Sequence, residues 1–307
     1  MIPFVLRRMG TALVVAWLAL TLAFVVLRWA PGDAVDATLA RSGGSAEEIA
    51  ARRAALGLDD PVGQQYLAYL AGLVRGDLGE SLISGQPVSE MLADSFVPTA
   101  TLSLLALVLA VALGVLLGVL AGAAPYAIVR AAADGTASLA LSTPVYWTAT
   151  LAIYLFTVVL GLLPGVGGTG PRYLILPAGV LGFHTAGSIA RVTASSIRES
   201  AGQDFVRTAQ AKGLPDAQVL DHILRVGLLP VVAVVALQLG FLLGGTVITE
   251  IIFVRRGLGR VLILAVNNRD YPVIQGLVVL AAVTYSLVNA LADVVYSLVD
   301  PRVRSAD

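Results

Sequence analysis

Residues 95–129 read SFVPTATLSLLALVLAVALGVLLGVLAGAAPYAIV, a run without a single Asp, Glu, Lys or Arg. About 20 consecutive apolar residues carry a helix across the hydrocarbon core of a bilayer. This run is too long for one crossing and too short for two, so it must include flanking loop. Pro98 is expected to precede the span and Pro125 to follow it. The stretch therefore predicts a membrane-spanning helix.

Five further runs free of these four charged residues are long enough for one crossing each. They cover residues 9–27, 135–171, 173–190, 226–249 and 271–292. Turn-forming residues from Leu163 to Pro171 are expected to close the third span. The fourth span is the weakest, because Pro177 and several glycines interrupt it. The sequence therefore predicts an all-α polytopic membrane protein with six transmembrane helices.

The overall composition agrees with a membrane protein. The chain is 57% hydrophobic and 13% charged, whereas soluble domains carry about 25% charged residues. This balance excludes a soluble enzyme, a disordered chain and a nucleic-acid binder. The chain has no Cys, so disulfides and Cys metal sites are excluded. The spans lack acidic residues, and neither H-E-x-x-H nor G-x-S-x-G occurs. No catalytic site is predicted.

Basic residues predict the orientation of the chain. Arg7 and Arg8 precede the first apolar run, which is longer than the hydrophobic part of a usual signal peptide and is expected to be retained. Counted over the short loops alone, an inside N-terminus places ten basic residues inside and five outside. Basic residues favour the cytoplasmic side, although four arginines between Glu250 and Asp270 oppose the rule. We expect both termini in the cytoplasm.

Residues 31–97 form a predicted extracytoplasmic helical subdomain, inserted after the first transmembrane helix (1–30). Ser45 and Glu48 have the spacing of a capping box, and Gly57 can end that helix in a left-handed conformation. Asp60-Pro61 then predicts the start of a second helix. Its apolar face is expected to consist of Tyr66, Leu67, Leu70, Leu73 and Val74. The subdomain is either a lid on the membrane helices or a docking surface for an external partner.

Residues 191–225 form the longest predicted cytoplasmic loop. They read as two short amphipathic helices separated by Gly213-Leu214-Pro215, with Val206, Ala209 and Gln210 on one face of the first helix. That face either packs on the chain's own helix ends or the lipid interface, or inserts into a groove of a cytoplasmic partner. Periodicity alone favours the first alternative.

The same loop carries a family resemblance. Residues 207–232, RTAQAKGLPDAQVLDHILRVGLLPVV, resemble the EAA loop of ABC-importer membrane subunits in its peptide/nickel permease form. Arg207-Thr208-Ala209 stands in place of Glu-Ala-Ala, and Pro215 stands where a capping Ser is common. Other blocks resemble the same subfamily in the same order: RWAPGD (28–33), GDLGES (76–81), LGGTVITEIIF (243–253), NRDYPVIQG (268–276) and YSLVDPRVR (296–304).

The resemblance implies a type I ABC-importer permease in the bacterial plasma membrane. Its transmembrane core would cover residues 98–292, followed by a cytoplasmic tail (293–307). The implied partners are a second permease, two cytoplasmic ATPases that use ATP and Mg, an external solute-binding protein, a peptide substrate and lipid. No cofactor is implied in this chain, which has no Walker motif. The implied ATPase-coupling residues are Phe205, Arg207, Thr208, Ala209, Ala211, Lys212, Gly213 and Leu214.

Two ladders of small residues predict close helix packing in the membrane. Gly114, Gly118 and Gly122 are expected to pack within the chain. For Ala236, Gly240 and Gly244, the resemblance implies the permease–permease interface or the solute path. Polar groups within spans tend to face protein or a cavity, or they form structural hydrogen bonds. The candidate residues for the path or interface are Gln238, Gly240, Gly244, Thr246 and Asn289.

Three other features have simpler interpretations. His184 and His222 lack neighbours for a metal site and are expected to be structural. Glu250 and Asp270 are expected to form ion pairs with arginines of the loop between them rather than to bind substrate. Two alternatives to peptide import stay open: an importer of nickel or another small solute, and an ion-coupled secondary transporter. The second lacks the carboxylate within a span that proton relays use, and a membrane enzyme lacks site chemistry.

Overall fold

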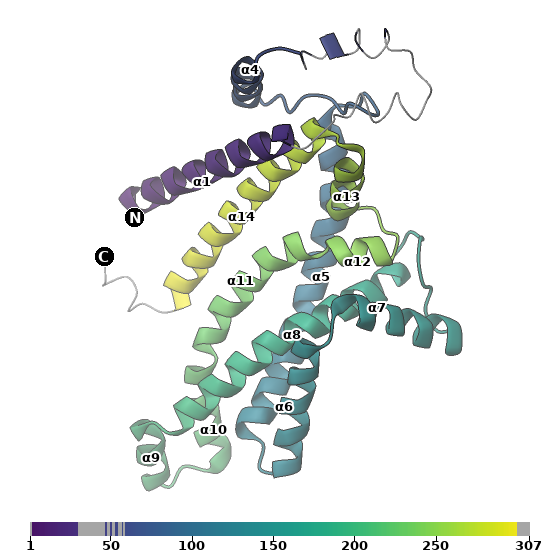
Figure 1. The fold of residues 1–307 in the computed structure, drawn as a ribbon. Coiled ribbons are helices and arrows are strands. Elements are labelled where there is room, and N and C mark those ends of the chain that lie inside the picture. The colour runs from purple at the N-terminus through teal and green to yellow at the C-terminus, as the bar shows by residue number, and fades with distance from the viewer. Residues whose placement is uncertain are drawn as a thin grey trace. The chain divides into compact units, whose positions relative to one another are not determined.

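The structure, a computed structural model, describes residues 2–29, 47, 50, 53–54, 57 and 59–299. All regular elements among them are helices, apart from a single antiparallel bridge between Glu80 and Pro87 (Figure 1). The chain divides into two compact units. The first unit comprises Met1–Thr99 and Arg256–Ser286, and the second comprises Ala100–Arg255 and Leu287–Asp307.

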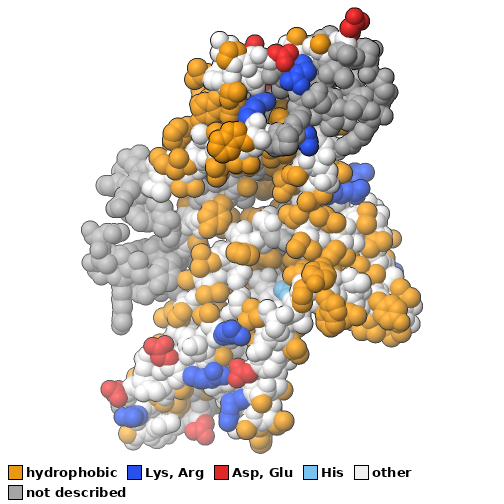
Figure 2. Space-filling model, viewed as in Figure 1, with side chains coloured by type: hydrophobic (Ala, Val, Ile, Leu, Met, Phe, Trp, Pro, Cys, Tyr) orange, Lys and Arg blue, Asp and Glu red, His pale blue; other side chains and the backbone are white. Residues whose placement is uncertain are grey.

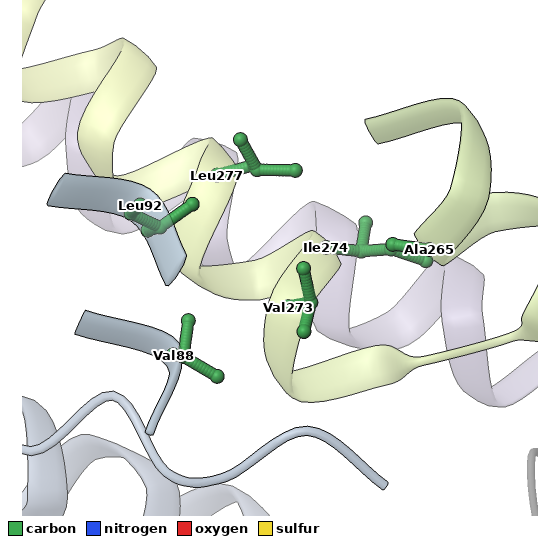
Figure 3. Packing of buried hydrophobic residues seen from close by; sticks show 6 residues of the cluster. All are labelled: Val88, Leu92, Ala265, Val273, Ile274 and Leu277. Carbon is green, nitrogen blue, oxygen red and sulfur yellow. The ribbon is translucent and has the colours of Figure 1, made fainter. Parts of the chain in front are cut away.

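The core of the first unit joins two segments that lie far apart in the sequence. Its helices are α1 (Ile2–Trp29), α4 (Val62–Val74), the start of α5 (Val88–Ala123), α13 (Leu258–Asn268) and the first part of α14 (Tyr271–Val299). The start of α5, α13 and α14 bury a shared apolar cluster (Figure 3). Its buried members are Val88, Leu92, Ala265, Val273, Ile274 and Leu277.

Helix α4 packs through its tyrosines. The Tyr66 and Tyr69 rings lie 5.2 and 6.2 Å from the ring of Phe24 on α1. Burial, and to a lesser degree Tyr66, raise the pKa of Tyr69 to about 12. The predicted apolar face was therefore wrong in part, since Leu67 and Val74 are 66% and 90% exposed. Tyr66 packs inward as predicted, and Tyr69, which the prediction did not include, packs beside it on Phe24.

The segment before α4 tests the capping predictions. Gly57 has the predicted left-handed conformation, with φ +63°. The N-cap of α4 is Pro61 without a side-chain cap, so the prediction of Asp60 as N-cap was wrong by one residue. The Asp60 carbonyl instead accepts a hydrogen bond from Gln65 Nε2 at 2.7 Å. The predicted capping box of Ser45 and Glu48 lies outside the described residues.

Asp270 connects the turn before α14 to the GDLGES segment. Its carboxylate is buried and accepts hydrogen bonds from Ser81 Oγ at 2.5 Å and from the Leu82 amide at 3.0 Å. The expectation that Asp270 pairs with an arginine of its loop was wrong. A hydroxyl and a backbone amide satisfy the carboxylate instead, as a buried charge requires.

Helix α8 (Arg172–Ala201) is the centre of the second unit. It contacts α6 (Ala127–Ser142), α7 (Val145–Ile153), α10 (Asp216–Gly227), α11 (Leu229–Gly245) and α12 (Val247–Ile252) (Figure 1). A short π-helix, η1 (Tyr154–Val159), continues α7, and α9 (Asp204–Ala211) follows α8. The span predicted to be weakest is thus the most extensively packed, and its helix continues to Ala201, into the predicted loop.

Small residues bring α5 and α8 into close contact. A Cβ atom on Gly118 would lie 2.3 Å from Thr193 Cβ and 2.8 Å from the Ala190 carbonyl oxygen. A Cβ atom on Gly114 would likewise be too close to Ile189, and one on Gly122 would be close to Ile197. This confirms the prediction that the first glycine ladder packs within the chain. The contact fixes α8 against α5 over about two helical turns.

The third predicted span is not one straight helix. α6 and the α7–η1 segment meet at a bend of 104°, because Pro144 has no N–H to donate to the Ala140 carbonyl and cannot continue α6. His184 Nδ1 on α8 donates to that carbonyl at 2.7 Å, and its Nε2 lies 3.1 Å from Thr148 Oγ1. His184 thus has the structural role predicted for it.

The described helices account for the apolar runs of the sequence. α5, α8 and the first 22 residues of α14 are each long and apolar enough to span a membrane, and two bent pairs, α6 with α7–η1 and α10 with α11, raise the number to five. Residues Leu13–Trp29 of α1 form a shorter apolar helix. Pro98 lies inside α5 rather than before it. The fold is therefore all-α, polytopic and membrane-spanning.

Candidate coupling surface and solute path

Helices α9 and α10 confirm the prediction of two short amphipathic helices. Gly213 ends α9 with φ +73°, a conformation that favours glycine. The Leu214 amide then donates to the Ala209 carbonyl at 3.2 Å. Pro215 is the N-cap of α10 and makes no side-chain cap hydrogen bond. Asp216 in the first turn instead complements the helix dipole.

The apolar face of α9 is covered by the chain itself. Val206 is buried with Val219 and Ile223 of α10 and with Ile197 of α8. Three predicted coupling residues pack against this cluster: Phe205, Ala209 and Leu214. Gln210, assigned to the same face by periodicity, is exposed. The structure therefore favours packing on the chain's own helix ends, the first of the two alternatives for this face.

The opposite face of α9 is exposed and polar. Side-chain exposure reaches 97% at Asp204 and 81% at Arg207, whose charged groups lie 3.9 Å apart. Thr208 and Ala211 complete this outer face, and Lys212 and Gly213 follow it, also exposed. The predicted coupling residues thus divide into an inner group that holds α9 in place and an outer group that is open to contact. We call Asp204, Arg207, Thr208 and Ala211 the α9 outer face.

Close packing connects this helix pair to α8. A Cβ atom on Gly227, at the end of α10, would lie 3.2 Å from the Cα atom of Ile197. Close approach at this glycine, together with the apolar cluster that Ile197 shares with Val206, Val219 and Ile223, packs the helix pair tightly on α8. A displacement of α9 and α10 would therefore move α8.

The candidate path residues occupy different environments. Gln238 Nε2 on α11 donates to Ser188 Oγ on α8 at 2.5 Å. Thr246 is 1% exposed, whereas Gly244 is exposed and a Cβ atom there would meet nothing within 4 Å. Gly240 on α11 and Asn289 on α14 are half-buried. The structure thus brings Gln238 to α8, but shows no hydrogen bond between any two of these residues in the described part of the chain.

Ser188 was missed by the sequence interpretation. The sequence does indicate Ser188, because it follows His184 by four residues on the same helix. This spacing places both polar groups on one face.

The turn after α12 is held by backbone contacts. Arg255 Nη1 donates to the Tyr173 carbonyl at 3.2 Å, and the Arg255 amide donates to the Glu250 carbonyl at 2.8 Å. Burial lowers the pKa of Arg255, and the attraction of the Glu250 carboxylate opposes this shift. Val254, which lies between Glu250 and Arg255 in the sequence, has φ +50°. This is a strained conformation for a β-branched residue. The surrounding contacts hold this turn in place.

Family comparison defines the class of protein that carries this arrangement. Residues 114–305 match the family described as the binding-protein-dependent transport system inner membrane component. Residues 1–105 match the N-terminal domain of the same membrane components. The chain belongs to this family and is a multi-pass protein of the inner membrane.

Curated relatives match the chain along its whole length. The dipeptide transport system permease protein DppB of Escherichia coli K12 is 39% identical over 99% of both chains. The glutathione transport system permease protein GsiC of Salmonella typhimurium LT2 is 36% identical over 99% of both. A crystal structure of an amino acid ABC transporter with histidines matches 70% of this chain and 94% of its own, with a TM-score of 0.53 at 17% identity. This last likeness shows the shared permease fold.

Proposed function

We propose that this chain is the membrane-spanning permease subunit of an ATP-driven, binding-protein-dependent importer of short peptides. The observation that carries the proposal is the full-length likeness to permeases named for dipeptide and glutathione transport. Both of these named substrates are short peptides. The same likeness favours an ATP-driven importer over an ion-coupled secondary transporter, since the family takes its solute from a binding protein.

The energy for transport would come from partner subunits. Two cytoplasmic ATPases would bind ATP and Mg, and a second, similar permease would complete the channel. The α9 outer face, together with Lys212 and Gly213, would contact an ATPase. The inner residues Val206 and Ala209 anchor α9 on α10 and α8, so movement of the ATPases would rock α8 and switch the path between inward- and outward-open states.

The orientation follows from the same assignment. If α9 meets a cytoplasmic ATPase, the end of α8 that precedes it lies on the cytoplasmic side. The short loops on that side carry ten basic residues against five on the other, which agrees with the rule for basic residues. Both termini would then be cytoplasmic, and residues 31–97 would lie outside, where a solute-binding protein could dock.

Affinity purification of the tagged chain from native membranes tests the proposal. We expect a second permease and two ATPases to co-purify, together with a solute-binding protein after mild crosslinking. Mass spectrometry of the ligand released from that binding protein should identify short peptides. Release of a metal complex or a sugar would show that the importer carries another solute. Purification without any ATPase would contradict the importer assignment itself.

A further inference from the structure

A polar stripe runs along the second half of α8. Its members are His184, Ser188, Arg191 and Ser195, separated by four, three and four residues. This spacing places them on one face of a helix. His184 and Ser188 are half-buried, and Arg191 and Ser195 are exposed. We call these four residues the α8 polar stripe.

The opposite face of α8 is apolar or tightly packed. Ala186, Ile189, Ala190 and Thr193 are all buried there, and Ile189 and Thr193 meet the glycines of α5. The stripe is therefore not a consequence of α8 being polar all round. Figure 2 shows polar and charged surface over the lower part of α8, below a more apolar region.

Two helices border the stripe. On one side α6 reaches α8, where a Cβ atom on Gly187 would lie 2.9 Å from the Ala137 carbonyl oxygen. On the other side α11 reaches it through the hydrogen bond from Gln238 to Ser188. His184 is tied to the Ala140 carbonyl at the end of α6. The stripe thus lies between α6 and α11: His184 contacts the end of α6, Ser188 contacts α11, and Arg191 and Ser195 are exposed.

The position of the stripe in the membrane restricts what it can face. His184 and Ser188 lie within the predicted fourth span, 173–190, and Gln238 lies within the fifth, 226–249. Polar groups at membrane depth that are not covered by protein face water rather than lipid. Arg191 and Ser195 continue the same face toward α9, which leads out of the membrane. The stripe is therefore arranged as expected for residues that line an aqueous passage.

The chemistry of the stripe suits a particular solute. Ser188 and Gln238 supply neutral hydrogen-bond donors and acceptors, which match the amide groups of a peptide backbone. Arg191 is exposed and forms no ion pair with any described residue. Its guanidinium can bind a carboxylate, and charge-assisted hydrogen bonds of this kind are the stronger ones.

We propose that the α8 polar stripe, with Gln238, lines the cytoplasmic half of the solute path and binds short peptides there. Neutral side chains contact the peptide amides, and Arg191 contacts a carboxylate of the peptide. The inference rests on the proposed function for the identity of the solute, but the presence of the aqueous wall does not depend on it.

Cysteine accessibility tests the wall directly, because the chain contains no native cysteine. Ser188→Cys and Ser195→Cys are introduced into the assembled transporter in inside-out membrane vesicles. Leu139→Cys on α6 and Leu237→Cys on α11 serve as controls, since these leucines are 58% and 59% exposed but apolar. A charged, membrane-impermeant thiol reagent is added, and modification of this subunit is followed by mass. We expect the two stripe cysteines to react at least about tenfold faster than the controls, since charged reagents avoid the hydrocarbon.

The outcomes separate the wall from its solute. Stripe cysteines that react no faster than the controls would show that lipid or another subunit covers the stripe, which overturns the proposal. Fast reaction that a short peptide slows supports both the wall and the peptide. Fast reaction slowed by a different solute, and not by peptides, would retain the wall and contradict the proposed function.

Arg191 has a test of its own. In the Ser188→Cys background, Arg191→Gln should raise the peptide concentration needed for protection by about tenfold, the effect expected for one lost charge-assisted hydrogen bond. Arg191→Lys keeps the positive charge and should retain most of the protection. Equal protection in the Ser188→Cys protein and in its Arg191→Gln and Arg191→Lys variants would show that Arg191 does not bind the peptide.

Discussion

Replacing Gly118 by alanine is expected to destabilise the protein and to reduce the amount of assembled complex. The added Cβ would lie 2.3 Å from Thr193 Cβ and 2.8 Å from the Ala190 carbonyl oxygen. Neither atom is the mobile end of a flexible side chain, so α5 and α8 must separate. Overpacking of this kind costs about 1–3 kcal/mol or more. Thermal unfolding in detergent and the yield of purified complex measure the effect.

Gly179→Ala is the matched control, on α8 itself. A Cβ atom there would meet nothing within 4 Å, and alanine is the better helix former by about 1 kcal/mol. The unfolding temperature of this variant should be unchanged or slightly raised. If both alanine variants unfolded at the wild-type temperature, the close α5–α8 contact described above would be wrong.

Replacing Ala211 by tryptophan is expected to weaken the contact with the ATPase, and so to reduce both stimulated ATP hydrolysis and transport, without unfolding the chain. Ala211 is exposed on the α9 outer face, so a larger side chain there lies away from the apolar cluster that holds α9 on α8 and α10. It would, however, prevent a partner from approaching that face closely. We expect the ATP hydrolysis stimulated by the loaded binding protein, and peptide uptake, to fall at least about tenfold, since a lost docking contact commonly costs more than 1.4 kcal/mol.

Ala131→Trp supplies the comparison. Ala131 is an equally small, exposed residue, but it lies on α6 rather than on α9. This variant should keep wild-type coupling and wild-type stability. Normal coupling in Ala211→Trp would show that the α9 outer face does not contact the ATPase. A lowered unfolding temperature of Ala211→Trp would indicate instead that Ala211 has a packing role.

The limits of sequence-based prediction are clearest at the prolines. Charge-free runs located the spans well, because a charged side chain is costly at membrane depth. The same sequence could not distinguish Pro98 and Pro177, which lie inside helices, from Pro144, which ends one. The difference depends on tertiary contacts, since His184 from another helix satisfies the carbonyl that Pro144 leaves without its donor.

At α9, the periodicity of apolar residues predicted the apolar face but not the residues that cover it. It placed Val206 and Ala209 correctly on one face of a short helix, but the width of an apolar face does not say what covers it. Ile197 and Val219 cover it here, and they come from two other helices. The α8 polar stripe was equally visible as a spacing of four and three residues. Its meaning required knowing which faces of α8 were already occupied by α5, α6 and α11.

The central claim is that ATP hydrolysis in partner subunits drives peptide import through this chain. Uptake of a radiolabelled dipeptide into liposomes containing the purified complex tests it most directly, with the binding protein outside and ATP and Mg inside. We predict uptake that requires both ATP and the binding protein and that persists when ionophores collapse every ion gradient. Uptake by this chain alone, driven by an ion gradient without ATP, would contradict the account.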